Sequence, residues 1–242
     1  MLYKVIRLSK SIADSGYCSR RQAGRKIYAG DVSIDGKPAL TDGWIDKSHV
    51  GSITINGHKL APIPPKIYLI YNKPVGVDCN YSNTNQASLL GKIDHPFRVF
   101  PIGRLDKDSH GLLLLTNDGE FCQQLMHPDY HHPKTYRVRV SEPLKPDFAE
   151  LMSAGVEILK TCTKPCQVMQ THRDEFEIVL TQGLNRQIRR MCKKLGYHVT
   201  DLQRLSILSF NLDRLEIGQW REIKSDELDT LRIALKSKAN SV

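Results

Sequence analysis

The sequence predicts an α+β protein with a small N-terminal domain and a larger domain in which helices lie on a sheet. Short apolar segments separated by turn residues predict strands through most of the chain. An amphipathic pattern predicts a helix over residues 185–195. Three prolines within residues 61–65 indicate a stiff linker. We therefore expect domains at residues 1–60 and 67–235, a linker at 61–66 and a frayed tail at 236–242.

The first domain is expected to begin as helix, turn, helix and strand. A helix over residues 8–14 ends at Gly16, and Ser19 with Gln22 three positions later predicts the N-cap of a second helix that runs to Gly30. A strand at 31–34 then leads into an Asp-Gly turn. Arg21 and Arg25 share one side of the second helix, which gives it a basic face. A solvated helix face explains this pattern equally well.

The second domain is expected to alternate strands with a few helices. The segment 78–89 is polar and predicts a long loop without a core of its own. The predicted strands are 67–71, 99–102, 112–115, 134–140, 167–169, 176–180 and 202–210, and the predicted helices are 119–126, one that begins near Pro146, 185–195 and 225–235.

A polar loop between two of these strands is the strongest candidate for a site. Its side chains are anchored at both ends by apolar strands, which holds them more firmly than those of a free surface loop. Within it, Asp106 is flanked by Arg104, Lys107 and Asp108. A carboxylate among cations stays ionised and can act as a nucleophile or base. The alternative is a charged hairpin loop in which Arg104 and Asp108 pair in solvent.

Charge points to a polyanionic partner. The formal net charge is +9, and the first 60 residues hold ten Lys or Arg against five Asp, or +5 of that total. Six scattered cysteines indicate reduced thiols in a cytoplasm, and neither Cys162 with Cys166 nor the histidines of residues 127–132 have the spacing of a zinc site. No stretch is long and apolar enough to predict a membrane span, so we expect a soluble protein.

Four stretches carry a resemblance to a known family. They read NKPVG at residues 72–76, GRLDKDSHGLLLLTNDG at 103–119, KTYRV at 134–138 and GLNRQIRRMC at 183–192. In content and order they resemble the motifs of pseudouridine synthases, in the branch that acts on ribosomal RNA, and the last is most similar to large-subunit members. The N-terminal stretches SRRQA and GDVSIDGK resemble the small S4-type RNA-binding domain.

The resemblance implies a fold, a reaction and a set of catalytic residues. The fold is a mixed, mainly antiparallel sheet flanked by helices, and the reaction turns uridine into pseudouridine without a cofactor or metal. Asp106 matches the catalytic carboxylate, and Arg189 matches the basic residue that pairs with it, although a phosphate is an alternative partner. Tyr136 matches the active-site tyrosine that stacks on the flipped uracil. A Tyr that simply packs in the core is the alternative reading.

The same resemblance implies RNA contacts in both domains. The substrate is expected to be 23S ribosomal RNA, with a transfer RNA of similar stem-loop as a second substrate, and the protein is expected to be a cytoplasmic monomer. The alternative function is a noncatalytic RNA-binding protein on a synthase scaffold. The residues expected to contact RNA are Lys73, Arg104, Arg186 and Arg190 in the second domain and Lys10, Arg20, Arg21 and Arg25 in the first.

Overall fold

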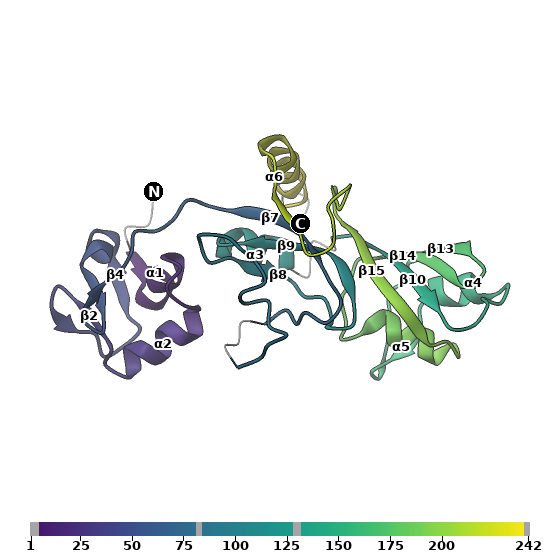
Figure 1. Ribbon diagram of the computed structural model, residues 1–242, viewed down its shortest axis with the longest axis horizontal. Helices are drawn as coiled ribbons and strands as arrows, with labels where there is room; N and C mark the ends of the chain where they lie inside the picture. Colours follow the sequence, from purple (N-terminus) through teal and green to yellow (C-terminus); the bar gives the residue numbers. More distant parts are fainter. Residues whose placement is uncertain (1–4, 81–83, 128–131, 240–242) are drawn as a thin grey trace. The chain divides into compact units, whose positions relative to one another are not determined.

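The computed structural model describes residues 5–80, 84–127 and 132–239 (Figure 1). The chain divides into two compact units, of which the first runs to Ile67 and also takes in His95–Phe100 and Thr116–Gly119. The second comprises Tyr68–Asp94, Pro101–Leu115 and the chain from Glu120 onward. The predicted α+β class is confirmed.

The first unit packs two short helices on small sheets. A four-stranded sheet has the order β3-β2-β5-β6, and β1 pairs antiparallel with β4. The predicted capping box is present, because Ser19 and Gln22 bond each other's backbone at the start of α2. The elements are β1 (Val5–Arg7), α1 (Leu8–Asp14), α2 (Arg20–Tyr28), β2 (Val32–Ile34), β3 (Lys37–Pro38), β4 (Trp44–Asp46), a 3-10 helix (Lys47–Ser52), β5 (Ile53–Ile55) and β6 (His58–Lys59).

The second unit is built on a nine-stranded sheet of order β13-β14-β10-β15-β9-β7-β17, with β16 beside β15 and β8 beside β9. Strand β10 is antiparallel to β14 and β15, whereas β15 runs parallel to β9. The strands are β7 (Tyr68–Lys73), β8 (Phe100–Ile102), β9 (His110–Thr116), β10 (Lys134–Val140), β13 (Gln167–His172), β14 (Glu175–Leu180), β15 (Val199–Ile207), β16 (Phe210–Asn211) and β17 (Trp220–Glu222), and β11 (Glu157–Ile158) pairs separately with β12 (Thr161–Cys162).

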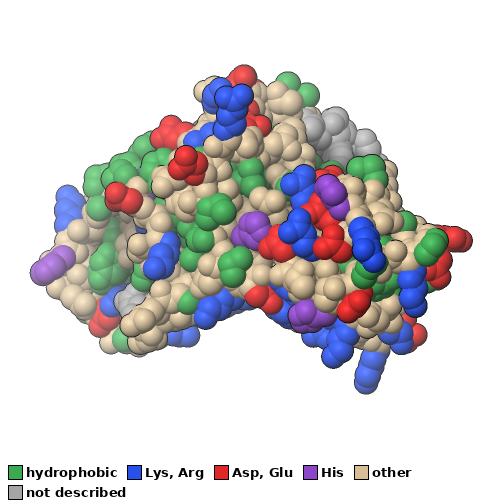
Figure 2. All heavy atoms as spheres, turned by 45° about the vertical axis from the view of Figure 1, so that its right-hand side comes forward, with side chains coloured by type: hydrophobic (Ala, Val, Ile, Leu, Met, Phe, Trp, Pro, Cys, Tyr) green, Lys and Arg blue, Asp and Glu red, His purple; other side chains and the backbone are tan. Residues whose placement is uncertain are grey.

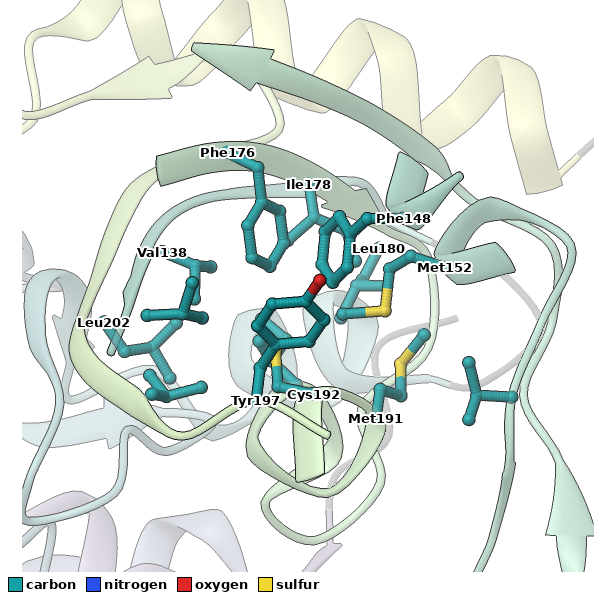
Figure 3. Close-up of a cluster of buried hydrophobic side chains, with 14 of the residues drawn as sticks. Val138, Phe148, Met152, Phe176, Ile178, Leu180, Met191, Cys192, Tyr197 and Leu202 are labelled. Atoms are coloured by element: carbon teal, nitrogen blue, oxygen red, sulfur yellow. The ribbon is translucent and has the colours of Figure 1, made fainter. Parts of the chain in front are cut away.

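Two clusters of buried side chains hold helices on this sheet. Helices α4 (Phe148–Ser153) and α5 (Gln187–Lys194) pack on β10, β14 and β15. There Met191 and Cys192 belong to the same buried cluster as Phe148 and Phe176 (Figure 3). Helices α3 (Gly119–Met126) and α6 (Ser225–Ala239) contribute to the second cluster, with β7, β8, β9 and β15. The burial of these apolar side chains away from water stabilises the sheet that carries the site.

Ion pairs cover the β10–β14 part of the sheet. In the right-hand part of Figure 2, acidic and basic side chains lie side by side. Arg137 bonds Glu177 at 3.1 Å and Arg139 bonds Glu175 at 3.0 Å, each across the β10–β14 pair. The alternating arginines of β10 are therefore matched by glutamates on the neighbouring strand.

Several predicted elements differ from the structure. The strand predicted at 202–210 begins at Val199 and stops at Ile207, because Leu208 takes a positive φ of 54° before β16. The tail predicted as frayed from 236 is helical to Ala239, because α6 continues. The segment predicted as a loop at 78–89 contains no helix or strand among its described residues, but Leu89 at its end is fully buried, and residues 81–83 lie outside the described part.

Within the described residues, no helix combines the length and the apolar character needed to cross a membrane.

Candidate active site

The central loop, residues 103–109, joins β8 to β9 inside the sheet of the second unit. Four consecutive leucines of β9, residues 112–115, are fully buried, so the outgoing strand is fixed in the core. Asp106 lies in the middle of the loop with a side chain that is 33% exposed. The sequence thus places an accessible carboxylate on a rigid support.

Arg186 brings the two aspartates of the loop together. Its guanidinium forms a two-point contact with Asp108, at 3.0 and 2.7 Å, and lies 3.6 Å from the Asp106 carboxylate. Arg186 precedes α5 and has a left-handed backbone conformation, with φ 50°. A non-glycine residue in this region is strained and is common at functional sites.

Arg189 takes a different partner from the one predicted. The sequence predicts a pair with Asp106, but Nη2 of Arg189 donates to the Asp108 carbonyl at 2.7 Å, and its Nε lies 3.4 Å from the Asp108 carboxylate. Its Nη1 donates to Val199 O. Because Arg189 lies within α5 and is only 14% exposed, it reaches the end of the loop where β9 begins, and Arg186 reaches Asp106 instead.

The charges of this cluster reinforce one another. The hydrogen bond from Arg186 is the largest cause that lowers the pKa of Asp108, against the opposing effect of burial. The same bond raises the pKa of Arg186. Asp108 and Arg186 are therefore both ionised over the neutral pH range, and the pair keeps its geometry there.

Lys73 is not an RNA contact in this structure. Its side chain is fully buried and its ammonium donates to Ser109 O at 2.7 Å and Pro74 O at 2.9 Å. Burial lowers its pKa, and the nearby Cys79 opposes that effect. The sequence predicts that Lys73 lines the pocket and contacts RNA, with a surface cation as the alternative, because Lys rarely lies in a core. Lys73 instead fastens the end of the central loop to β7.

The other residues expected around the pocket have separate surroundings. Tyr136 is half-buried on β10, opposite Arg204 of β15, and packs against the cluster of Figure 3. Arg104 is 77% exposed and lies 4.0 Å from Asp78. Arg190 is exposed and bonds Asn185. The geometry therefore leaves Arg104 and Arg190 accessible to a ligand.

A shallow, open depression of about 410 Å³ lies beside the central loop. Its lining is made by Val75, Gly76, Lys107, Asp108 and Arg186, so Asp106 adjoins it in sequence. The amide of Gly76 donates to Lys107 O at 2.8 Å, which fastens the NKPVG segment to the loop. This size suits a nucleobase-sized group.

The basic residues of the first unit lie on its helices. Arg20, Arg21 and Arg25 are exposed on α2, and none has a carboxylate within 4.0 Å among the described residues. Lys10 pairs with Asp14 at 2.7 Å. Unmatched guanidinium groups at this surface leave a positive charge that attracts phosphate.

Two residues of the site were missed from the sequence. The sequence predicts for Asp108 only a place beside Asp106 or a solvent pair with Arg104, although a second carboxylate two positions after Asp106 is a visible signal. Arg204, on β15, bonds the carbonyls of Arg104 and Leu112. No local pattern in the sequence marks Arg204, because its partners are 92 and 100 positions away.

Among the residues that the structure describes, no group of three or more His, Cys, Asp or Glu lies in a metal-binding arrangement. Part of the histidine tract, residues 128–131, falls outside them.

The comparisons with known proteins agree on one protein family. The family model described as RNA pseudouridylate synthase matches residues 67–194. The chain is 39% identical to the dual-specificity RNA pseudouridine synthase RluF of Escherichia coli (strain K12), over 98% of this chain and 82% of that protein. It is 34% identical to the ribosomal large subunit pseudouridine synthase B of Bacillus subtilis (strain 168), over 93% and 95% of the two chains.

A solved structure is similar along nearly the whole chain. A crystal structure of a pseudouridylate synthase superposes with a TM-score of 0.68 at 28% identity, and the match covers 93% of this chain and 99% of that one. The similarity extends through both units. The four motifs of the sequence fall inside the residues matched by the family model, 67–194.

Proposed function

The chain belongs to the RNA pseudouridylate synthase family, and from this premise we propose that it isomerises one or a few defined uridines of 23S ribosomal RNA. The Bacillus relative is named as a large-subunit enzyme, which supports this substrate. We propose a transfer RNA with a similar stem-loop as a second substrate, which the dual specificity in the name of the Escherichia relative supports. We expect the protein to act as a monomer.

The reaction requires a base to leave its sugar and return through another atom. The bond between the sugar carbon C1′ and N1 breaks, the uracil turns, and a bond from C5 to C1′ forms while C5 loses its proton. Neither electrons nor a phosphoryl group change hands. The protein must therefore extract the nucleotide from the RNA stack, hold the uracil while it turns and supply acid–base or nucleophilic chemistry.

The observation that carries the proposal is the placement of Asp106. Its carboxylate lies on a loop fastened between two core strands, partly exposed and 3.6 Å from Arg186. In the proposed mechanism Asp106 is the nucleophile or base, Arg186 orients its carboxylate, and Arg189 supports it from the other end of the loop through Asp108.

The remaining roles follow from exposure and chemistry. Tyr136 would stack on the turned uracil and its phenol would assist the loss of the C5 proton. Arg104, which is 77% exposed, would contact the RNA where the target nucleotide has left the stack. Arg190 and the arginines of α2 would bind phosphates and add affinity that offsets the cost of flipping, about a few kcal/mol.

Release of tritium from RNA labelled at uridine C5 tests the proposal. The wild-type protein is expected to release tritium from 23S ribosomal RNA and from a subset of transfer RNA, because C5 loses its hydrogen only when a carbon bond forms there. Asp106→Asn is expected to release none, while its affinity for the same RNA stays within about twofold of wild type.

Asp229→Asn is the matched control, because Asp229 is an exposed carboxylate on α6. It should retain wild-type release. Binding without release by the wild-type protein would favour the noncatalytic RNA-binding alternative. Equal losses of binding and release in Asp106→Asn would contradict the catalytic role of Asp106.

A further inference from the structure

Arg204 links the start of the central loop to β9, the strand that leaves the loop. Its side chain is only 3% exposed. Nε donates to the carbonyl of Leu112 at 2.7 Å, and Nη1 donates to the carbonyl of Arg104 at 3.3 Å. Arg104 lies two residues before Asp106, and Leu112 lies in β9 beyond the loop. One planar guanidinium therefore fixes the separation of the strand that leaves the loop and the segment that enters it.

This buried charge is not paired with a carboxylate. Among the described residues, no Asp or Glu oxygen lies within 4.0 Å of Arg204, and its Nη2 is buried without a hydrogen-bond partner. A buried guanidinium is costly when it is uncompensated, and an apolar side chain of similar volume would serve the stability of the core better. Arg204 is therefore a costly residue for the core alone, and the two carbonyls that it binds give the buried guanidinium a role in holding the segments around the central loop.

The same residue connects the loop to Tyr136. In the antiparallel pair of β10 and β15, Arg204 lies directly opposite Tyr136. In the parallel pair of β9 and β15, it lies opposite Gly111. The backbones approach so closely there that a Cβ at residue 111 would lie 2.3 Å from the Arg204 carbonyl oxygen. Arg204 therefore touches, through its backbone or side chain, every segment that carries a proposed catalytic group other than α5.

We propose that Arg204 is a positioning residue for uridine isomerisation, which fixes the Asp106 loop relative to Tyr136. The inference rests on the proposed function. Arg204 does not touch the RNA, because its side chain is buried, and it acts through the carbonyls that it binds. Displacement of a reacting group by about 1 Å can cost about 100-fold in rate, so loss of this fork reduces the chemical step and leaves RNA binding intact.

The test compares Arg204→Met and Arg204→Lys with the wild type. Single-turnover tritium release at saturating RNA measures the chemical step, and filter binding measures affinity. We expect Arg204→Met to lose about 100-fold in rate, with affinity within about twofold of wild type. Arg204→Lys keeps the charge but can satisfy only part of the fork, so an intermediate rate is expected.

A second readout does not depend on activity. Amide hydrogen exchange across residues 103–112 of the RNA-free protein should be faster in Arg204→Met, because the loop loses two charged donors. Leu231→Ala provides the matched control, since Leu231 is buried in α6 and its truncation lowers stability without removing a hydrogen bond from the loop. It should lower the melting temperature while the rate of the folded enzyme and exchange in the loop stay at wild-type values.

Three outcomes overturn the proposal or its premise. If the rate of Arg204→Met falls only in proportion to the folded fraction, as in Leu231→Ala, Arg204 is merely structural. If exchange across the loop is unchanged, the fork does not hold it. If the wild-type protein binds RNA but releases no tritium, the proposed function fails first and Arg204 has no reaction to serve.

Discussion

The two aspartates of the central loop show how far residue patterns lead. The motif around Asp106 predicts a carboxylate on an anchored loop, and the structure has this arrangement. The motif cannot say which arginine reaches it, because that depends on where α5 begins. Arg186 precedes the helix in a left-handed conformation and reaches Asp106, while Arg189 lies within the helix and meets Asp108. The start of α5 therefore separates the partners of the two arginines.

The sequence also does not predict which charged side chains are buried. Lys73 ends an apolar strand, and the sequence predicts that it lines the pocket or lies at the surface, which is the usual place of a lysine. In the structure it is fully buried because two backbone carbonyls receive its ammonium. Carbonyl acceptors leave no trace in a side-chain pattern, so neither Lys73 nor Arg204 could be placed before the fold was known.

Asp108→Asn tests the role of the second carboxylate. The amide cannot neutralise the fork of Arg186 or the nearby Arg189, so the rate of isomerisation is expected to fall about 10-fold or more. RNA affinity should stay equal or rise, because a negative charge is lost. Single-turnover release and filter binding measure the two effects. Asp108→Glu, which keeps the charge, should fall less, and a rate unchanged in Asp108→Asn would show that the fork is dispensable.

Gly111→Ala tests the close approach of β9 and β15. A Cβ there would lie 2.3 Å from the Arg204 carbonyl oxygen, and the φ of 103° disfavours any side chain. We expect a loss of about 3 kcal/mol or more in the free energy of unfolding. Urea titration measures it. Gly119→Ala is the control, because nothing lies within 4 Å of its added Cβ. Equal stability of the two variants would contradict the inferred contact.

At the scale of elements, long patterns were more informative than short ones. The apolar stripe of α5 and the capping box of α2 are confirmed, since each repeats or spans a full helical turn. Strands of two or three residues, such as β3, β11 and β16, carry too few positions for a period to show. They form because neighbouring strands supply hydrogen-bond partners, and those neighbours are known only from the fold.

The contact between β17 and α6 predicts a pH dependence. Arg221 of β17 makes a two-point contact with Glu227 of α6, at 2.8 Å for each bond. This contact lowers the pKa of Glu227 to about 2, below the value of about 4.3 expected in the unfolded chain. The pair therefore stabilises the fold above the unfolded pKa, and the contribution disappears as the pH falls through about 2.

Glu227→Gln should accordingly be less stable than wild type by about 1 to 3 kcal/mol at pH 7. The difference should shrink between about pH 5 and pH 2. Urea unfolding at a series of pH values measures it. Glu216→Gln, at an exposed acid in the turn before β17, should stay close to wild type throughout. A difference for Glu227→Gln that is independent of pH would rule out the ion pair as its source.

At the scale of the whole molecule, charge is unevenly distributed. The surplus of cations in the first 60 residues was visible in the sequence, and three arginines of α2 lie exposed without a partnering carboxylate among the described residues. On β10, by contrast, Arg137 and Arg139 are matched by glutamates of β14. Counting charges predicted a basic first unit, but only strand pairing shows which cations remain to bind a polyanion.

The variant with Arg20, Arg21 and Arg25 all changed to Gln should bind RNA more weakly and with a smaller dependence on salt. Each lost phosphate contact lowers the slope of log affinity against log salt by about 0.7 to 0.9, so a change of about 2 is expected. Titrations between low and high salt measure it. The control variant has Arg214, Lys224 and Arg232 changed to Gln, so that it loses the same charge elsewhere. An equal change of the slope in the control would show that net charge alone causes the effect.

The link between Arg204 and the central loop also governs when the site can exist during synthesis. Its two hydrogen bonds join residues 92 and 100 positions apart, and the last sheet pair brings Trp220 to Tyr71. As the chain leaves the ribosome, the first unit can fold while the sheet still lacks β15 and β17. Closing such long loops is slow, and exposed strand edges persist meanwhile. The nascent chain would therefore bind RNA through α2, the contact proposed above, before it could modify any uridine.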